Sequence, residues 1–228
     1  MHMSVKADTK KLTSYLNSVQ RKQIPFATKN ALDDVAFDAR SYLKTALPKR
    51  LDRPTKPMIS SVRVKKSSKK NLTAVVGFVG LGFMKSPWQE TPAEIMRRHI
   101  RGGTRLPKGA HLKIPSDTKG GGIPLNVHGN IKGNKKAKIA KMLGNKDKFF
   151  EGVPKGGGYS TKDAGIWERI ITGTKRNKTS KIKQRIAYEP SAKYKVRFPF
   201  KRIVELAVKR NYRKRFNTAL KMALASAK

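Results

Sequence analysis

The spacing of apolar residues predicts a long helix near each end of the chain. In the N-terminal part, apolar side chains recur every three or four residues between Pro25 and Pro48, as in an amphipathic helix. Pro25 stands where the start of a helix tolerates proline, and Pro48 is expected to end the helix. A shorter helix is predicted before it, from a cap at Asp8 or Thr9 to about Gln20. The apolar positions of the longer helix are Ala27, Ala31, Leu32, Val35, Ala39, Tyr42, Leu43 and Ala46.

The C-terminal helix, expected from Pro199 onward, has the clearest pattern in the sequence. Apolar residues recur on one side of it, and the other side holds cations with a single acid, Glu205. We therefore expect one face to pack against the protein and the opposite face to be strongly positive. The apolar set is Val204, Ala207 or Val208, Tyr212, Phe216, Ala219, Leu220, Ala223 and Leu224, and the cationic set is Lys201, Arg202, Lys209, Arg210, Arg213, Lys214 and Lys221.

Alternation of apolar and polar residues predicts antiparallel strands between these helices. Residues 60–66 and 73–79 are expected to form a β-hairpin around a short polar connector. Residues 164–172 and 179–188 are expected to form a second pair of strands around the turn 173–178. The predicted fold class is α+β, with an antiparallel sheet packed against long N-terminal and C-terminal helices and with long Gly/Lys-rich loop excursions.

The middle of the chain has no sustained period. We expect a short helix from Pro92 to Ile100, opened by Thr91 as its cap, and a short basic helix from Lys135 to Leu143. Glycine and lysine are frequent in residues 105–134, so a long flexible excursion is expected there. The prediction is a single domain, residues 1–228, whose core comes from residues 8–83 and 160–228 and whose residues 84–159 are an irregular Gly/Lys-rich insertion.

Net charge changes this picture more than any other property of the composition. The chain has 53 Lys and Arg against 14 Asp and Glu, a formal charge of +39 over 228 residues. A compact protein with this excess repels itself, so we expect a polyanion or an acidic neighbour to neutralise it in the working state. The excess is spread along the whole chain, which is typical of a protein embedded in an assembly beside nucleic acid rather than of a domain with one basic arm.

Three groups of cations are the candidate contacts to DNA or to a partner. They lie at the tip of the predicted hairpin, on the short basic helix and on the positive face of the C-terminal helix. Phosphate contacts of this kind position DNA without reading its sequence. Any one lysine taken alone is expected to be a solvated surface charge. The candidates are Lys65, Lys66, Lys69, Lys70, Lys135, Lys136, Lys138, Lys141, Lys209, Arg210, Arg213 and Lys214.

The sequence offers no constellation of catalytic residues, and we predict that the chain is not an enzyme and uses no metal or cofactor. It has no cysteine, its four histidines form no close zinc-binding pair, and its glycine triplets lack the Gly-Lys-Ser/Thr ending of a P-loop. No apolar run approaches the roughly 20 residues that cross a bilayer. The N-terminus lacks the apolar centre of a signal peptide, so a soluble, cytoplasmic product is expected.

The acids near the predicted helices are expected to be structural. Those on the long N-terminal helix should pair with cations at helical spacing on its surface, and those at the start of the next helix should complement its dipole. The first set is Asp33, Asp34 and Asp38, near Lys29, Arg40 and Lys44, and the second set is Glu90 and Glu94.

Several segments, taken in order, resemble the minor tail protein Z family of tailed phages, also called tail completion proteins. Each motif is weak alone, but together they cover most of the chain in the order expected of that family. The segments are residues 23–27 followed by the Ala-rich helix, residues 51–55, residues 71–78, Gly102 and Gly103 before Arg105, residues 129–131, residues 165–169, and the closing stretch from Tyr194 with its Ala-ending helix.

The resemblance implies a structural virion protein without enzymatic activity, acting late in tail assembly at the head-proximal end of the tail, where genomic DNA passes. The hypothesis is a ring of several copies, six by analogy with the tail tube. The implied partners are further copies, tail terminator or tube proteins, head-completion proteins and packaged double-stranded DNA, with no membrane. The implied location is the tail or neck of the virion, after assembly in the host cytoplasm.

Two other classes of protein compete with this interpretation. A sequence-nonspecific nucleic-acid-binding protein of the ribosome- or nucleoid-associated type explains the charge equally well but not the order of the motifs. Such a protein should hold DNA or RNA directly with a steep salt dependence. A nuclease or toxin is disfavoured by the missing cluster of acids and histidines.

Overall fold

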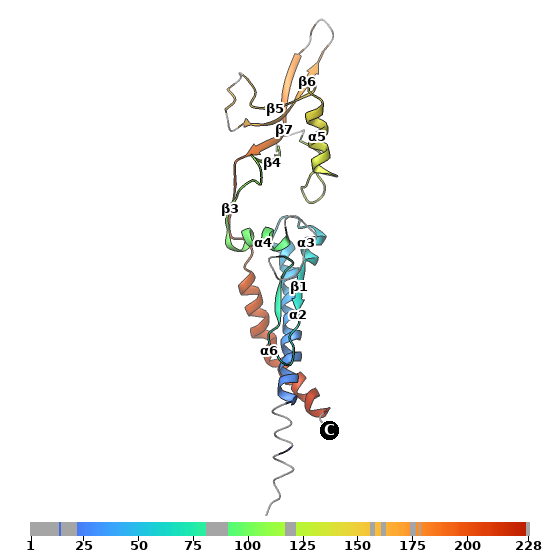
Figure 1. Ribbon diagram of the computed structural model, residues 1–228, viewed down its shortest axis with the longest axis vertical. Coiled ribbons are helices and arrows are strands. Elements are labelled where there is room, and N and C mark those ends of the chain that lie inside the picture. Colours follow the sequence, from blue (N-terminus) through green and yellow to red (C-terminus); the bar gives the residue numbers. More distant parts are fainter. Residues whose placement is uncertain are drawn as a thin grey trace, which may run out of the picture. The chain divides into compact units, whose positions relative to one another are not determined.

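The computed structural model describes residues 14, 22–80, 91–116, 122–155, 158–160, 163–173, 177 and 179–226. The chain divides into two compact units, one formed by residues 1–100 and 197–228 and the other by residues 101–196. The second unit is therefore inserted between two parts of the first. Figure 1 shows the elements of both units. Apart from Ser14, the helix predicted at residues 8–20 lies outside the described residues.

The first unit combines two long helices with a β-hairpin. Helix α2 spans Ile24–Arg50, helix α6 spans Phe200–Ala225, and the two lie side by side (Figure 1). Strands β1, Val62–Lys65, and β2, Val75–Phe78, form the predicted antiparallel hairpin, and both contact α2. Short helices α3, Lys56–Ser60, and α4, Pro92–Arg101, complete the set. The predicted α+β class, with antiparallel strands against long N-terminal and C-terminal helices, is confirmed.

The two long helices share a simple spacing of buried residues. Every fourth residue of α2 from Ala27 onward is buried, and α6 repeats the same interval from Ala207, with polar Asn211 and Arg215 at two of its positions. Ridges of residues four apart interdigitate in the commonest class of helix packing, and small side chains let the backbones approach. The stripe on α2 is Ala27, Ala31, Val35, Ala39, Leu43 and Leu47, and the buried alanines of α6 are Ala207, Ala219 and Ala223.

The end of α2 differs slightly from the prediction. Instead of stopping at Pro48, the helix continues through it to Arg50. A proline removes one backbone N–H and crowds the carbonyl four residues earlier. Leu43 and Leu47 are fully buried in the main core, and the Leu51 N–H donates to the Leu47 carbonyl at 2.9 Å. Core packing therefore holds the last turn in spite of the proline.

The main core of the first unit joins the hairpin and α4 to both long helices. Its buried members are Leu43, Leu47, Val62, Phe78, Met96 and Phe198. Helix α4 begins with the predicted cap: Thr91 Oγ1 accepts from the Glu94 N–H at 3.2 Å, and the Glu94 carboxylate accepts from the Thr91 N–H at 2.7 Å. This reciprocal pair satisfies two donors at the helix start. Glu90 lies outside the described residues.

The second unit is built on a four-stranded antiparallel sheet with the order β4-β7-β6-β5. These strands span Leu112–Pro115 (β4), Phe149–Gly152 (β5), Gly165–Thr172 (β6) and Thr179–Glu189 (β7). Helix α5, Lys135–Gly144, packs its buried Ile139 into the core beside Ile166 and Ile186. Separately, β3, Gly103–Arg105, pairs with β8, Ala192–Tyr194.

The organisation of this unit differs from the expected single domain with an irregular insertion. The strands predicted at 164–172 and 179–188 are present, but their outer partners β4 and β5 come from residues 84–159. The middle of the chain therefore shares a core with these strands. Gly165 lies in the interior of the sheet, where a Cβ would collide with the Ile186 carbonyl of β7. Glycine at this position lets the neighbouring backbone approach closely.

Replacing Ala31 by Leu tests the packing of α2 against α6. Ala31 is fully buried in a cluster with Ala219 and Ala223. The larger side chain must push the helices apart, so we expect the free energy of unfolding to fall by about 1–3 kcal/mol in denaturant titrations. Ala225→Leu, at an exposed position of α6, is the matched control and should change it by less than about 0.5 kcal/mol. Equal stability of the two variants would contradict this packing.

Candidate nucleic-acid interface

The side of α6 opposite its buried alanines carries a row of exposed cations. Arg210, Arg213, Lys214 and Lys221 line one shallow depression together with Asn217 and Thr218. Helical spacing puts these cations on the side of α6 that faces away from α2, because a turn takes about 3.6 residues. Arg202 and Lys209 are exposed on the same helix. All six residues that line the depression have polar or charged side chains, and all of its charges are positive.

Other cations of α6 are neutralised by acids. Lys201 pairs with Glu205 one turn away at 3.7 Å, and Arg215 pairs with Asp38 of α2 at 2.9 Å. Within the part of the chain that the structure describes, no ion pair involves the remaining cations of the helix, which are Arg202, Lys209, Arg210, Arg213, Lys214 and Lys221. The uncompensated charge of α6 is thus concentrated on one side of it.

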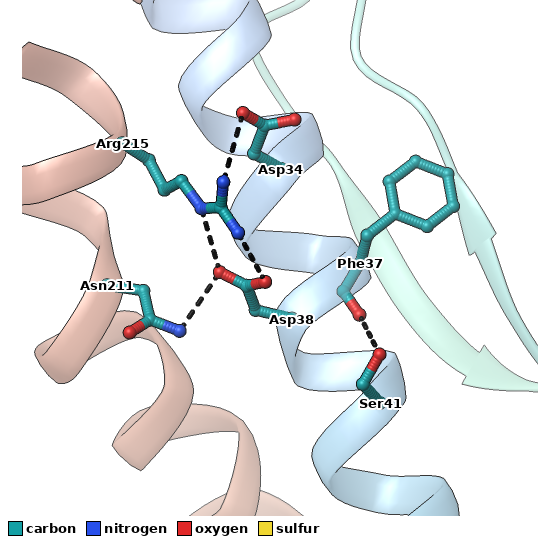
Figure 2. A network of polar contacts seen from close by, with 6 residues as sticks. All are labelled: Asp34, Phe37, Asp38, Ser41, Asn211 and Arg215. Carbon is teal, nitrogen blue, oxygen red and sulfur yellow. Dashed lines mark hydrogen bonds and ion pairs between the residues drawn. The ribbon is translucent and has the colours of Figure 1, made fainter. Parts of the chain in front are cut away.

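A polar network joins α2 to α6 in the middle of their contact (Figure 2). Arg215 donates to both carboxylate oxygens of Asp38, from Nε at 3.1 Å and from Nη2 at 2.9 Å, and the Asn211 amide donates to Asp38 at 2.9 Å. Asp34 lies 4.0 Å from the same guanidinium. The hydrogen bond to Asp38 raises the pKa of Arg215 above its ordinary value. The prediction that Asp34 and Asp38 pair with cations of their own helix is wrong, because their partner is on α6.

Asp33 fastens the connector of the hairpin to α2. One of its carboxylate oxygens accepts from the Ser67 N–H at 2.7 Å and from the Ser67 hydroxyl at 2.9 Å, and the other pairs with Lys29 at 2.9 Å. Burial by itself raises the pKa of Asp33, but the hydrogen bonds from Lys29 and Ser67 outweigh it and lower the pKa. The predicted pairing with Lys29 is confirmed, at a buried instead of a surface position.

The hairpin lysines are exposed, and two of them lie over aromatic rings of α2. The Lys66 Nζ is 5.6 Å from the centre of the Phe37 ring, and the Lys69 Nζ is 5.2 Å from that of Phe26. Such cation–π contacts help to hold the connector on the helix. Lys66 also lines a groove of about 540 Å³ between α2 and α6 in which Asp33 and Asp34 lie, so the charge there is mixed. Lys65 and Lys70 are the other two candidates of this group.

The candidates on α5 belong to the second unit. Lys135 donates from Nζ to the Lys113 carbonyl of β4 at 2.7 Å. Burial lowers the pKa of Lys135, as do the charges of Arg105 and Lys113. This lysine is therefore a structural contact between α5 and the sheet. The other α5 candidates are the exposed Lys136 and Lys141 and the half-buried Lys138.

The sequence analysis missed a buried ionic cluster in the second unit. Glu168 of β6 is buried and pairs with Arg185 of β7 and, at 3.1 Å, with Lys148 next to β5. Burial by itself raises the pKa of Glu168, but the hydrogen bonds from Arg185 and Lys148 outweigh it and lower the pKa. An acid between the apolar residues Trp167 and Ile170 of a predicted strand, with Arg185 on the next predicted strand, was the signal for this cluster.

Comparisons of this chain with protein-family models, with curated proteins and with solved structures gave no match. Among the described helices, none has both the length and the apolar composition of a membrane span. In the same described residues, no group of three or more His, Cys, Asp or Glu side chains is placed to hold a metal ion.

Arg215 and its near neighbour Arg213 provide a matched test of the network. Arg215→Gln leaves the half-buried Asp38 carboxylate without its guanidinium partner. We expect this change to lower the free energy of unfolding by about 0.5–1.5 kcal/mol, since the pair is partly exposed to solvent. Arg213→Gln removes an exposed cation that has no ion pair among the described residues, so it should leave stability unchanged within about 0.5 kcal/mol. Equal losses measured by denaturant unfolding would contradict the assignment.

The lowered pKa of Glu168 should make the stability of the second unit depend on pH. Its pKa in the folded chain lies below the ordinary value of 4.5, so its stabilising contribution is present above about pH 4.5 and is lost as pH falls through the folded pKa. Glu168→Gln should therefore be less stable than wild type at pH 7, and the difference should shrink between about pH 5 and pH 3. The difference in stability between the two proteins can be measured by hydrogen exchange of the β6 amides at each pH. A difference that stays constant over this range would contradict the ionised cluster.

Proposed function

We propose that the chain is a structural protein of a tailed-phage particle, which acts in tail completion at the head-proximal end of the tail. The observation that carries the proposal is the uncompensated cationic face of α6, which is part of a folded unit and not of a detachable tail. A formal charge of +39 is tolerable for a compact protein where a polyanion or acidic neighbours surround it. The segments that resemble the minor tail protein Z family, in their order along the chain, suggest that the phage particle is where this charge is neutralised.

In this proposal, several copies form a ring at the neck, and its symmetry follows that of the tail tube, which favours six copies. The ring contacts the tail terminator or tube proteins and the head-completion proteins. Basic surfaces face the channel through which genomic DNA passes, or acidic neighbours around it. The role of the chain is assembly and not catalysis.

A second candidate function, supported by the same cationic face, is sequence-nonspecific binding of nucleic acid in a ribosome- or nucleoid-associated role. The order of the phage-like segments favours the tail protein, since that order has no meaning for a general nucleic-acid binder. The two functions also predict different cellular locations, and these can be measured.

The proposal is tested by following the chain through an infection. We expect mass spectrometry to find it in purified particles at a fixed small number of copies. Interruption of its gene should let filled heads and unjoined tails accumulate, and expression in trans should restore joining. Recovery of the chain with ribosomes or the nucleoid, with none in finished particles, would instead support the second candidate and overturn the first.

A further inference from the structure

The cations of α6 without an ion pair in the described part of the chain lie on one side of the helix and extend along most of its length, with the exposed Leu206 between Arg202 and Lys209. The six cations without an ion pair among the described residues begin at Arg202 and end at Lys221. At about 1.5 Å per residue, these two positions are ~29 Å apart along the axis. Each strand of B-DNA carries a phosphate about every 3.4 Å of its axis. The geometry points to a specific partner for this face: the phosphate backbone of double-stranded DNA, which α6 contacts directly.

The composition of the depression on α6 favours DNA over an acidic protein surface as its partner. Specific protein–protein interfaces contain an apolar core with aromatic anchors, whereas interfaces with DNA are more polar and strongly positive. The depression on α6 is lined by Arg210, Arg213, Lys214, Lys221, Asn217 and Thr218, with no apolar side chain. The amide of Asn217 and the hydroxyl of Thr218 are donors of the kind that bind phosphate oxygens beside Arg and Lys. The lining thus has the chemistry of phosphate recognition without the anchors of a protein interface.

The first unit of a second copy offers this face few acids without a partner, since its exposed Asp52 pairs with Arg53. In the first unit, the acids Asp33, Asp34 and Asp38 are already engaged by Lys29 and Arg215. Glu94 is bound in the cap of α4, and Glu205 pairs with Lys201. Each added copy also brings a formal charge of +39. Self-association through α6 would therefore place like charges against each other, whereas DNA neutralises them.

The contact positions the DNA duplex without recognising its base sequence. Phosphate contacts fix orientation but carry no direct sequence information. Binding through this face should be independent of sequence and steeply dependent on salt. The inference goes beyond the proposed function, which leaves DNA and acidic neighbours as alternatives, and it rests on that function only for the source of the DNA.

The experiment measures binding of the purified full-length chain to a fluorescent 30-base-pair duplex between 50 and 200 mM salt. The test variant carries Arg210→Gln, Arg213→Gln, Lys214→Gln and Lys221→Gln. The matched control carries Lys108→Gln, Lys132→Gln, Lys146→Gln and Lys181→Gln, which removes the same charge from exposed positions of the second unit that are not among the candidate contacts. Glutamine is a good helix former and the control positions are exposed, so both variants should keep their circular dichroism spectra. A pair variant, Arg210→Gln with Lys214→Gln, provides a milder test.

We expect the slope of log K against log salt to become shallower by about 3.6 in the test variant, since each phosphate contact contributes about 0.9. In the pair variant the slope should become shallower by about 1.8, and in the control variant the slope should change little. Duplexes of A·T and G·C composition should bind equally. Polyglutamate of equal charge should compete much more weakly than unlabelled duplex.

Three results would overturn the inference. Equal loss of slope in the test and control variants would mean that binding follows total charge. Equal competition by polyglutamate would assign the face to an acidic protein. Absence of duplex binding at 50 mM salt would show that this face of α6 is not a DNA-binding site. None of these results affects the detection of the chain in particles, so failure here and failure of the proposed function are distinguishable.

Discussion

The packing of α2 against α6 is the constraint on which the first unit depends. Both helices bury alanines that recur at intervals of four residues, and Ala27, Ala31, Ala219 and Ala223 form a cluster of their own. Interdigitation of such ridges fixes the rotation of each helix about its axis, because only one face of each fits its partner. The rotation of α6 is fixed in turn, and this is what holds its cations together on the opposite, solvent-facing side.

Polar residues within this contact separate two kinds of cation on one helix. Asn211 and Arg215 stand at positions of the four-residue spacing where alanine would continue the stripe, and both bind Asp38. A charged group at a helix contact costs desolvation, which is offset when its hydrogen bonds are satisfied. The acids of α2 are used inside the protein in this way. The cations on the far side of α6 have no ion pair among the residues that the structure describes.

Periodicity allowed the long elements to be predicted, because their patterns extend over many residues. This is true of α2, α6 and the strands at 165–172 and 179–189. It did not reveal β4 and β5, which lie in the Gly/Lys-rich middle of the chain and are defined by their pairing with β7 and β6. The cationic face of α6 was also predictable from spacing. The pairing of Arg215 with Asp38 was not predictable from spacing, because the two residues lie 177 positions apart in the chain.

The insertion of the second unit has a consequence for biosynthesis. Translation delivers α2 first, then all of residues 101–196, and only afterwards the helix that covers its alanine stripe. At about 5–20 residues per second, the ribosome needs roughly 10–35 s to bridge that separation. During this interval the second unit can fold completely. The first unit cannot, because its C-terminal part has not yet been synthesised. Premature termination between the end of β7 and the start of α6 thus leaves a complete four-stranded sheet in a chain whose helical unit is unfinished.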